Sequence, residues 1–333
     1  MITARSTPNI ALIKYWGNRN DDLRLCAAGS TSMTLDGPYV DVSVECADTF
    51  SVSSHNKKLG EKDIARFSKT YELIKTYLTA QSSQLRAQSS LSISIDSHIP
   101  PSIGLASSAA VFSALAKAIA GLLDTGLTDE QISVMARLGS GSAARSIFGG
   151  FAALTNHESR IANNELIDTS TAYQIATSEH WPLHDIIIVP SMDEKKVGST
   201  EGHAAAWSSP HFRDRLSAIE HHRLQDCIDA IREKDFEKLQ QVAEEDCLDM
   251  HRCMSTQTPP LNYLNAETHR ITGEIEEIRK SEHLPVLYTM DAGPTVHLFC
   301  EESARMRVLE YAKAQKGCAI FEARAGKGSR ILG

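Results

Sequence analysis

The stretch from Pro100 to Ala110, Pro-Pro-Ser-Ile-Gly-Leu-Ala-Ser-Ser-Ala-Ala, constrains the fold more than any other part of this 333-residue sequence. It follows the alternating segment Leu91–Ile95, which predicts a strand, and it opens an apolar run from Ala106 to Leu123, which predicts a buried helix. The first N–H groups of a helix have no partner within it, and the helix dipole favours negative charge there. The stretch therefore predicts a phosphate-binding loop.

This loop is not a Walker loop, because the spacing G-x-x-x-x-G-K-[ST] is absent, and Gly-Lys-Gly-Ser at Gly326–Ser329 does not match it either. In the phosphate-binding interpretation, Gly104 lets the backbone approach the ligand, and Ser107 and Ser108 face the same point. An ordinary Gly/Ser turn that caps a core helix is the alternative on these residues alone.

Length and composition indicate a soluble globular protein. The chain is long enough for two domains, and we place their boundary near Pro182, giving residues 1–182 and 183–333. We find neither a long apolar span nor a secretory leader, so we expect a cytoplasmic protein without a membrane partner. The net charge of -8 argues against nucleic acid as a partner, although it permits a local basic pocket for a small anion.

The seven cysteines are odd in number and include no C-x-x-C pair, so we expect reduced thiols and neither a disulfide framework nor a zinc site. Cys247 and His251 would share one face of a helix, which is the spacing of a metal-binding pair. Cys253 would lie on another side, and no fourth ligand is at hand. We therefore predict no metal-ligating residues.

The rest of the chain alternates helices with short strands, which is typical of an α+β fold. Apolar residues recur three and four positions apart between residues 61 and 78, which predicts an amphipathic helix with a charged outer face. Further helices are predicted over residues 128–139, 213–233, 235–253, 262–280 and 303–313. Strands are predicted over residues 151–154, 185–189, 285–289, 296–300 and 318–323, and a strand with a hairpin over 40–52.

Four segments resemble, in the same order, signatures of the mevalonate phosphate/diphosphate decarboxylases within the GHMP kinase superfamily. They are Asn9–Gly17 (Asn-Ile-Ala-Leu-Ile-Lys-Tyr-Trp-Gly), the loop after Pro100, Gly139–Ser146 (Gly-Ser-Gly-Ser-Ala-Ala-Arg-Ser) and Met290–Pro294 (Met-Asp-Ala-Gly-Pro). The resemblance implies a two-domain GHMP kinase fold of the α+β class. Its N-terminal domain would resemble ribosomal protein S5 domain 2, its C-terminal domain would be ferredoxin-like, and the site would lie in the cleft between them.

The resemblance also implies roles for particular residues. Asp291 would face the tertiary hydroxyl of the substrate, Lys14 would keep that carboxylate ionised, and Arg145 would hold the C1 carboxylate of the substrate. ATP and Mg²⁺ are the implied cofactors. Residues implied in ATP binding are Gly104, Leu105, Ala106, Ser107 and Ser108. Residues implied in substrate binding are Tyr15, Asn18, Ser140, Ser142, Arg145, Ser199 and His203.

The implied reaction begins with transfer of the ATP γ-phosphoryl group to the 3-hydroxyl of a phosphorylated mevalonate. The new phosphate then leaves together with CO₂, which produces an alkene. A related mevalonate 3-kinase stops after phosphorylation and lacks the Asp/Lys/Arg trio, which this chain has, so we predict decarboxylation.

Asn18 bears on the substrate, because the diphosphate-specific enzymes usually have a lysine there that contacts the 5-diphosphate. We therefore expect mevalonate 5-phosphate as substrate and isopentenyl phosphate as product, which places the chain closest to the phosphomevalonate decarboxylases. Arg19 could substitute for the lysine, which keeps the diphosphate as the alternative. A kinase without decarboxylation and a non-catalytic binding protein are further alternatives. Beyond the small-molecule substrate, we expect a second copy of the chain as partner in a homodimer.

Overall fold

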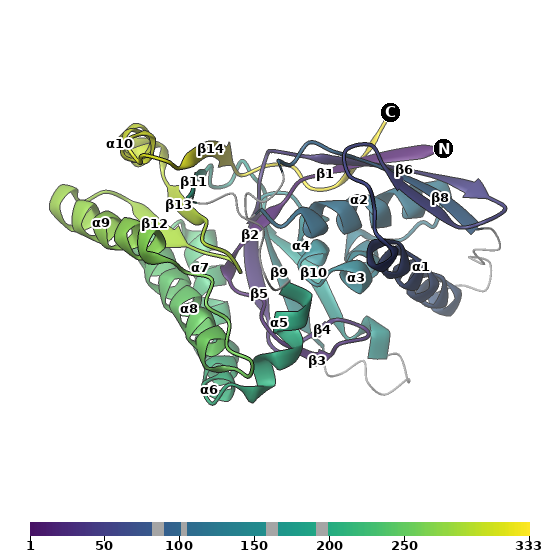
Figure 1. The fold of residues 1–333 in the computed structure, drawn as a ribbon, viewed down its shortest axis with the longest axis horizontal. Helices are drawn as coiled ribbons and strands as arrows, with labels where there is room; N and C mark the ends of the chain where they lie inside the picture. The colour runs from purple at the N-terminus through teal and green to yellow at the C-terminus, as the bar shows by residue number, and fades with distance from the viewer. Residues whose placement is uncertain (82–89, 101–104, 158–165, 191–198) are drawn as a thin grey trace.

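The computed structural model describes residues 1–333 except 82–89, 101–104, 158–165 and 191–198. Its described strands form three larger sheets and one two-stranded sheet, with helices between and beside them (Figure 1). The predicted α+β class is confirmed. Among the described residues, no helix combines the length and apolar character that crossing a membrane requires.

The first sheet has five strands in the order β15-β1-β6-β8-β7 and is antiparallel except for the β7–β8 pair. The strands are β1 (Ile2–Ser6), β6 (Val40–Ala47), β7 (Ser51–Ser54), β8 (Ser90–Ser97) and β15 (Arg330–Leu332). In β8 the predicted alternation buries Leu91, Ile93 and Ile95 and leaves the serines between them partly exposed. The apolar helix α2 (Ser107–Leu122) packs on β1 and β6.

The second sheet has four antiparallel strands in the order β10-β9-β5-β2. These are β2 (Asn9–Ile13), β5 (Ser30–Thr34), β9 (Phe151–Asn156) and β10 (Ser170–Ala176), and β3 (Asn18–Asn20) pairs with β4 (Leu25–Cys26) beside them. Nearby lie the helices α1 (Glu61–Gln81), α3 (Asp129–Gly139) and α4 (Ala143–Ser146). Because α3 and α4 both contact α2, the start of α2 and the α3–α4 loop come close together.

The third sheet is antiparallel, in the order β12-β13-β11-β14. Its strands are β11 (His184–Val189), β12 (Val286–Thr289), β13 (Val296–Cys300) and β14 (Ala319–Arg324). The helices of this half are α5 (Ser199–Ala205), α6 (Phe212–Ala218), α7 (Leu224–Glu233), α8 (Phe236–Thr256), α9 (Ala266–Glu282) and α10 (Glu302–Lys313). Helix α8 contacts both β12 of this sheet and β2 of the second one, so it links the two halves.

Most predicted elements are present, with three corrections. Residues 40–52 do not form a hairpin, because β8 lies between β6 and β7 and pairs with both. A π-helical turn at Ile219–Arg223 interrupts the helix predicted over residues 213–233. The sequence prediction omitted β3, β4, β5, β10, β15 and α5. Strand β5 reads Ser-Thr-Ser-Met-Thr and is fully buried, so it has no apolar/polar alternation to detect.

The Gly-Lys-Gly-Ser segment at Gly326–Ser329 is a backbone crossing. Gly326 lies so close to the chain at Leu35 and Asp36 that a Cβ atom would be 2.3 Å from the Leu35 carbonyl oxygen, and a Cβ on Gly328 would be 2.3 Å from that of Ile147. Only glycine fits such approaches. The segment thus allows the chain to pass Gly149 and reach β15.

Candidate active site

A cavity of about 340 Å³ lies where the end of β2, the start of α2, the α3–α4 loop and the turn after β12 converge. It gathers most of the residues that the sequence singled out: Lys14, Tyr15, Asn18, Leu105, Ala106, Ser107, Ser108, Ser140, Ser142, Arg145, His203 and Asp291. Gly104 and the side chain of Ser199 lie outside the described residues. Residues from five distant parts of the chain therefore face one space.

Lys14 and Asp291 form an ion pair inside this cavity, with 2.6 Å between Lys14 Nζ and Asp291 Oδ1. Lys14 follows the edge strand β2 and its side chain is 1% exposed, whereas the side chain of Asp291 is 26% exposed. Burial opposes ionisation of Asp291, but Lys14 and then His297 more than offset it, so the pKa of this carboxyl lies below its ordinary value. Asp291 is therefore a carboxylate at neutral pH and can accept a proton or a hydrogen bond.

Arg145 on α4 is a buried cation held by neutral groups. Its Nε donates to Ser32 Oγ at 2.9 Å, Nη1 donates to Ser30 Oγ, and Nη2 donates to Asn9 Oδ1 at 3.2 Å. Among the described residues no carboxylate lies within ion-pair distance of it. Burial lowers the pKa of Arg145 to about 10, against the opposing effect of Asp291, so the group stays charged at pH 7. It is suited to bind a carboxylate of a ligand.

The start of α2 is open toward the same cavity. Ala106 occupies the N-cap position and provides no side-chain hydrogen bond. The N–H groups of Ser107 and Ala109 donate to the backbone carbonyl oxygens of Leu105 and Ala106. Ser108 Oγ lies 3.2 Å from Ser140 Oγ on the α3–α4 loop, and Ser107 is exposed. This is the geometry of a site for an anion such as a phosphate, and it differs from the alternative of an ordinary capped turn.

At the other end of the cavity, His203 is fixed as a neutral ring. Its Nδ1 accepts a hydrogen bond from the Gly17 N–H at 2.9 Å, and its ring lies 4.9 Å from that of Tyr15 and 4.5 Å from that of Trp16. Burial lowers the pKa of His203 to about 3. Because Nδ1 accepts, the proton is on Nε2, which makes Nε2 a donor for a ligand.

Asn18 lines the cavity, but its amide is occupied. Its oxygen accepts from the Tyr15 hydroxyl, and its nitrogen donates to Asp21 Oδ1 at 2.8 Å. Arg19 turns away from the cavity and donates to Thr169 Oγ1 at 2.6 Å. The expectation that Arg19 replaces a missing lysine is therefore wrong, because its guanidinium is engaged elsewhere.

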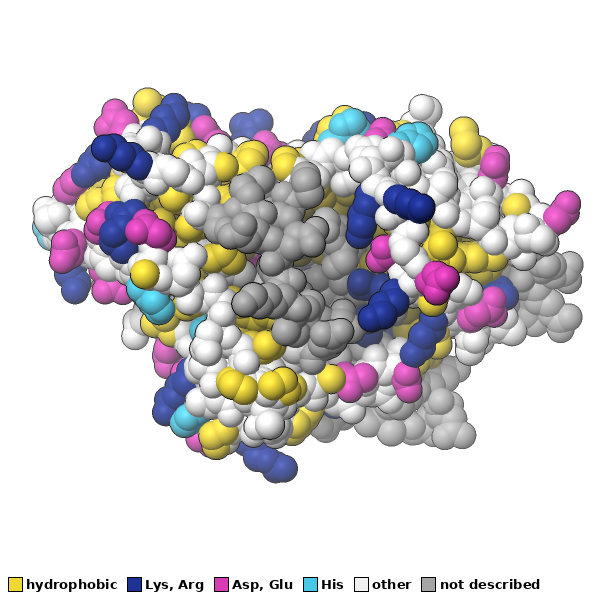
Figure 2. Space-filling model, viewed as in Figure 1, with side chains coloured by type: hydrophobic (Ala, Val, Ile, Leu, Met, Phe, Trp, Pro, Cys, Tyr) yellow, Lys and Arg dark blue, Asp and Glu magenta, His cyan; other side chains and the backbone are white. Residues whose placement is uncertain are grey.

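Two arginines that sequence reasoning missed, Arg24 and Arg66, line this end. Arg24 adopts a left-handed backbone (φ 51°), and its Nε donates to the Leu138 carbonyl; Arg66 Nη2 donates to that of Gly139 at 2.7 Å. Burial lowers the pKa of both, that of Arg66 to about 10. In the part of the chain that the structure describes, neither has an ion-pair partner. Lys and Arg side chains gather on the face between α1 and the β3–β4 hairpin (Figure 2).

No local pattern identifies these two arginines. Arg66 lies on α1 among the charged residues that the helical period assigns to the outer face, and Arg24 lies in a short polar turn between β3 and β4. Only the packing of α1 and this hairpin against the end of α3 turns both toward the cavity.

Comparisons with known proteins agree with this arrangement. Residues 6–165 match the diphosphomevalonate decarboxylase-like N-terminal domain family, and residues 185–322 match the mevalonate 5-diphosphate decarboxylase C-terminal domain family. Diphosphomevalonate decarboxylase of Candida albicans is 34% identical over 319 residues, covering 90% of this chain and 84% of its own. The human enzyme of that name is 30% identical over 312 residues, which cover 90% of this chain and 76% of the human enzyme.

Solved structures give the same result. Mevalonate diphosphate decarboxylase from Staphylococcus aureus superposes with a TM-score of 0.88 at 30% identity, covering 100% of this chain and 99% of that one. A structure described as MDDEF in complex with MVAPP, AMPPCP and magnesium has a TM-score of 0.86 at 29% identity and covers 99% of this chain and 98% of its own. The fold predicted from the sequence is therefore confirmed.

Proposed function

The chain belongs to the diphosphomevalonate decarboxylase family, and we propose that it converts mevalonate 5-diphosphate to isopentenyl diphosphate in an ATP-dependent decarboxylation. The observation that carries this proposal is the arrangement of one cavity. It brings together an ionised carboxylate beside a lysine, the buried Arg145, and the two arginines Arg24 and Arg66, and none of the three arginines has an ion-pair partner among the described residues. Such a cavity fits a small hydroxy acid with a carboxylate at one end and a larger anion at the other.

Asp291 acts on the 3-hydroxyl of the substrate. As a carboxylate it accepts or orients the hydroxyl proton while the oxygen attacks the γ-phosphorus of ATP, a role that contributes typically 10² to 10⁴ in rate. Lys14 keeps Asp291 ionised and leaves its second oxygen available for the substrate. The carboxylate therefore acts as base without needing an unusual pH.

The start of α2 and its serines would hold the phosphates of ATP. The positive end of the α2 dipole, together with the hydroxyl groups of Ser107 and Ser108, fits the phosphate tail and would stabilise the charge on the transferred group. When bound, ATP supplies the phosphoryl group, and Mg²⁺ neutralises its phosphates.

Arg145 directs the second half of the reaction. Its guanidinium would hold the C1 carboxylate of the substrate, and Ser140 and Ser142 line the cavity beside it. As the C3–O bond to the new phosphate breaks, the C1–C2 bond gives its electron pair to form the C2–C3 double bond, and CO₂ leaves. Because the partners of Arg145 are neutral, its charge is available to fix this alignment.

Arg24 and Arg66 support the diphosphate over the monophosphate. Asn18 in place of a lysine favours mevalonate 5-phosphate, but two guanidinium groups that have no ion-pair partner among the described residues line the same cavity. The relatives named above are diphosphate enzymes, which supports the same choice. The Nε2–H of His203 adds a neutral donor there. Phosphomevalonate decarboxylation remains the second candidate, and the hydrogen-bonded Asn18 amide is the observation that favours it.

The test compares CO₂ and ADP release from mevalonate 5-diphosphate and mevalonate 5-phosphate. We expect kcat/KM for the diphosphate to exceed that for the monophosphate by at least about tenfold, or 1.4 kcal/mol. A preference for the monophosphate would overturn the substrate assignment in favour of the second candidate. ADP release without CO₂ would instead identify a kinase.

We also propose the division into residues 1–182 and 183–333, which is supported by the start of the third sheet at His184. Homodimer formation and a cytoplasmic location stay predictions, to be checked by light scattering and by fractionation.

A further inference from the structure

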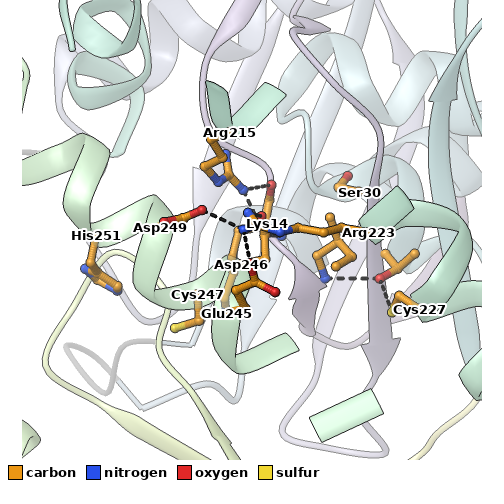
Figure 3. A network of polar contacts seen from close by, with 12 residues as sticks. Lys14, Ser30, Arg215, Arg223, Cys227, Glu245, Asp246, Cys247, Asp249 and His251 are labelled. Atoms are coloured by element: carbon orange, nitrogen blue, oxygen red, sulfur yellow. Dashed lines mark hydrogen bonds and ion pairs between the residues drawn. The ribbon is translucent and has the colours of Figure 1, made fainter. Parts of the chain in front are cut away.

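The backbone of Lys14 is held by side chains rather than by a neighbouring strand. The ladder between β2 and β5 ends at Ile13, and β2 is the edge of its sheet. The Lys14 N–H donates to Asp246 Oδ2 at 2.7 Å, and the Lys14 carbonyl oxygen accepts from Arg215 Nη2 at 2.8 Å. Arg215 Nη2 also lies 2.8 Å from Asp246 Oδ2. The two members of this ion pair therefore hydrogen-bond to the N–H and the carbonyl oxygen of Lys14 (Figure 3).

This ion pair is buried and incompletely satisfied. The side chains of Asp246 and Arg215 are 0% and 1% exposed, and two nitrogens of Arg215 have no hydrogen-bond partner in the part of the chain that the structure describes. Arg223 Nη1 lies 3.5 Å from Asp246 Oδ1, while its Nη2 pairs with Glu245 and Asp249 (Figure 3). Apolar residues of similar volume often stabilise a fold at least as well as buried charges do. The charges therefore suggest a role beyond stability.

The next residue of the same helix holds the segment that bears Asp291. Cys247 Sγ accepts from the Met290 N–H at 3.2 Å and lies 3.5 Å from the Met290 carbonyl oxygen. Helix α8 thus contacts the backbone at Lys14 through Asp246 and the backbone next to Asp291 through Cys247. Two consecutive residues of α8 therefore hydrogen-bond to the backbone of the two segments that carry Lys14 and Asp291, whose side chains lie 2.6 Å apart.

We propose that α8 sets the distance between Lys14 and Asp291, with Asp246 as the positioning residue for Lys14 and Cys247 as the positioning residue for Asp291. The inference rests on the proposed function, which assigns the chemistry to this pair. A helix is well suited to the task because its hydrogen bonds keep the spacing of its own residues constant. A displacement of about 1 Å in a reacting geometry costs on the order of 100-fold in rate.

Several groups besides Lys14 face Asp291 and bear on its titration. They are Arg145 on α4, His297 on β13, and Cys247 and His251 on α8. A substitution at position 246 replaces none of these groups. Loss of the negative charge of Asp246 by itself would favour ionisation of Asp291 and lower its midpoint, so a raised midpoint in such a variant reports on Lys14.

The experiment uses Asp246→Asn in the full chain, with Glu245→Gln as the matched control. Glu245 is the neighbouring carboxylate on α8; it pairs with Arg223 and does not touch Lys14. The carboxyl ¹³C shift of Asp291, assigned by its loss in Asp291→Asn, is titrated in each protein. We expect the midpoint to rise by about one unit or more in Asp246→Asn, because the lysine no longer faces the carboxylate closely, and to stay native in Glu245→Gln. We also expect kcat to fall about 100-fold and KM for ATP to change less than twofold.

A folded Asp246→Asn protein with a native Asp291 midpoint and native kcat would overturn the proposal. If Asp246→Asn does not fold, Cys247→Ala decides, because it keeps every ion pair of Asp246. There we expect the midpoint to move in the same direction, and an unchanged titration with unchanged kcat would refute the role of α8. The titration does not depend on turnover. If a variant raises the Asp291 midpoint but the native protein releases no CO₂, the positioning role of α8 stands and the proposed function is rejected.

Discussion

The two ends of the cavity hold positive charge in different ways. At the Asp291 end, Lys14 is paired with a carboxylate, and the ion pair behind it fixes its backbone. At the Asn18 end, Arg24 and Arg66 donate only to backbone carbonyl groups among the described residues. A paired cation tunes the group that it touches, whereas an unpaired one is available to a ligand. The comparison separates the residues that we expect to change kcat from those that we expect to change KM.

The largest expected effect is at Asp291. Asp291→Asn keeps the shape of the side chain but cannot accept a proton, so we expect kcat to fall by about 10² to 10⁴. The measurement is coupled ADP release alongside CO₂ release, with Asp22→Asn as control because Asp22 pairs with Lys69 on the exposed surface. Activity within tenfold of native would contradict the role of Asp291 as base.

Arg145 gives a second, smaller effect and a test of charge pairing. Arg145→Gln removes a charge-assisted contact to the substrate carboxylate, which is worth about 2 kcal/mol, or roughly 30-fold in kcat/KM. Because Arg145 has no described carboxylate partner, its removal leaves no buried charge unpaired, and we expect little loss of thermal stability.

Arg215→Gln is the contrasting variant. It removes one of the two cations beside the buried Asp246, so we expect a clear fall in Tm by calorimetry. Equal Tm values for Arg145→Gln and Arg215→Gln would contradict the expected difference between a buried arginine with an ion-pair partner and one without.

At the opposite end, Arg66→Met is expected to raise KM for mevalonate 5-diphosphate about tenfold with little change in kcat, since it removes binding remote from the reacting atoms. Arg19→Met is the matched control, because Arg19 is a neighbouring cation that contacts Thr169 outside the cavity. Steady-state kinetics on both phosphorylated mevalonates would show whether the loss is larger for the diphosphate. A similar rise in KM for both variants would contradict a localised anion site.

The smallest effect concerns one histidine at each end. Burial lowers the pKa of His203 to about 3 and that of His251 to about 4. Both folded pKa values are depressed, so each neutral ring contributes stability that is present above the ordinary histidine pKa and is lost as pH falls below it. Between pH 7 and pH 5.5 we expect each to remove about 1 kcal/mol from the free energy of unfolding.

His203→Gln and His251→Gln should each flatten this decrease by a similar amount in urea unfolding at several pH values. A decrease that neither substitution changes would show that the rings take up protons while folded.

The sequence predicted those parts of the site that lie in contiguous segments. Lys14, Arg145 and Asp291 each stand within a short motif, and the α2 start follows from a strand, a small-residue loop and an apolar run. Arg24, Arg66 and Asp246 could not be found in this way, because each acts on a residue far away in the chain. Their neighbours in the sequence are polar and typical of a surface, and only tertiary packing buries Asp246 and partly covers the two arginines. The same holds for β5, whose small polar residues are buried by neighbours.

The return of β15 to β1 has a mechanical consequence. The chain leaves the N-terminal half before β11 and comes back after β14, and in Figure 1 the final strand lies beside the first one. The C-terminal half is therefore joined to the N-terminal half by two chain connections, one before β11 and one after β14. Buried residues of both halves also belong to one hydrophobic core. Cutting either connection alone would leave the two halves joined by the other connection and by that core.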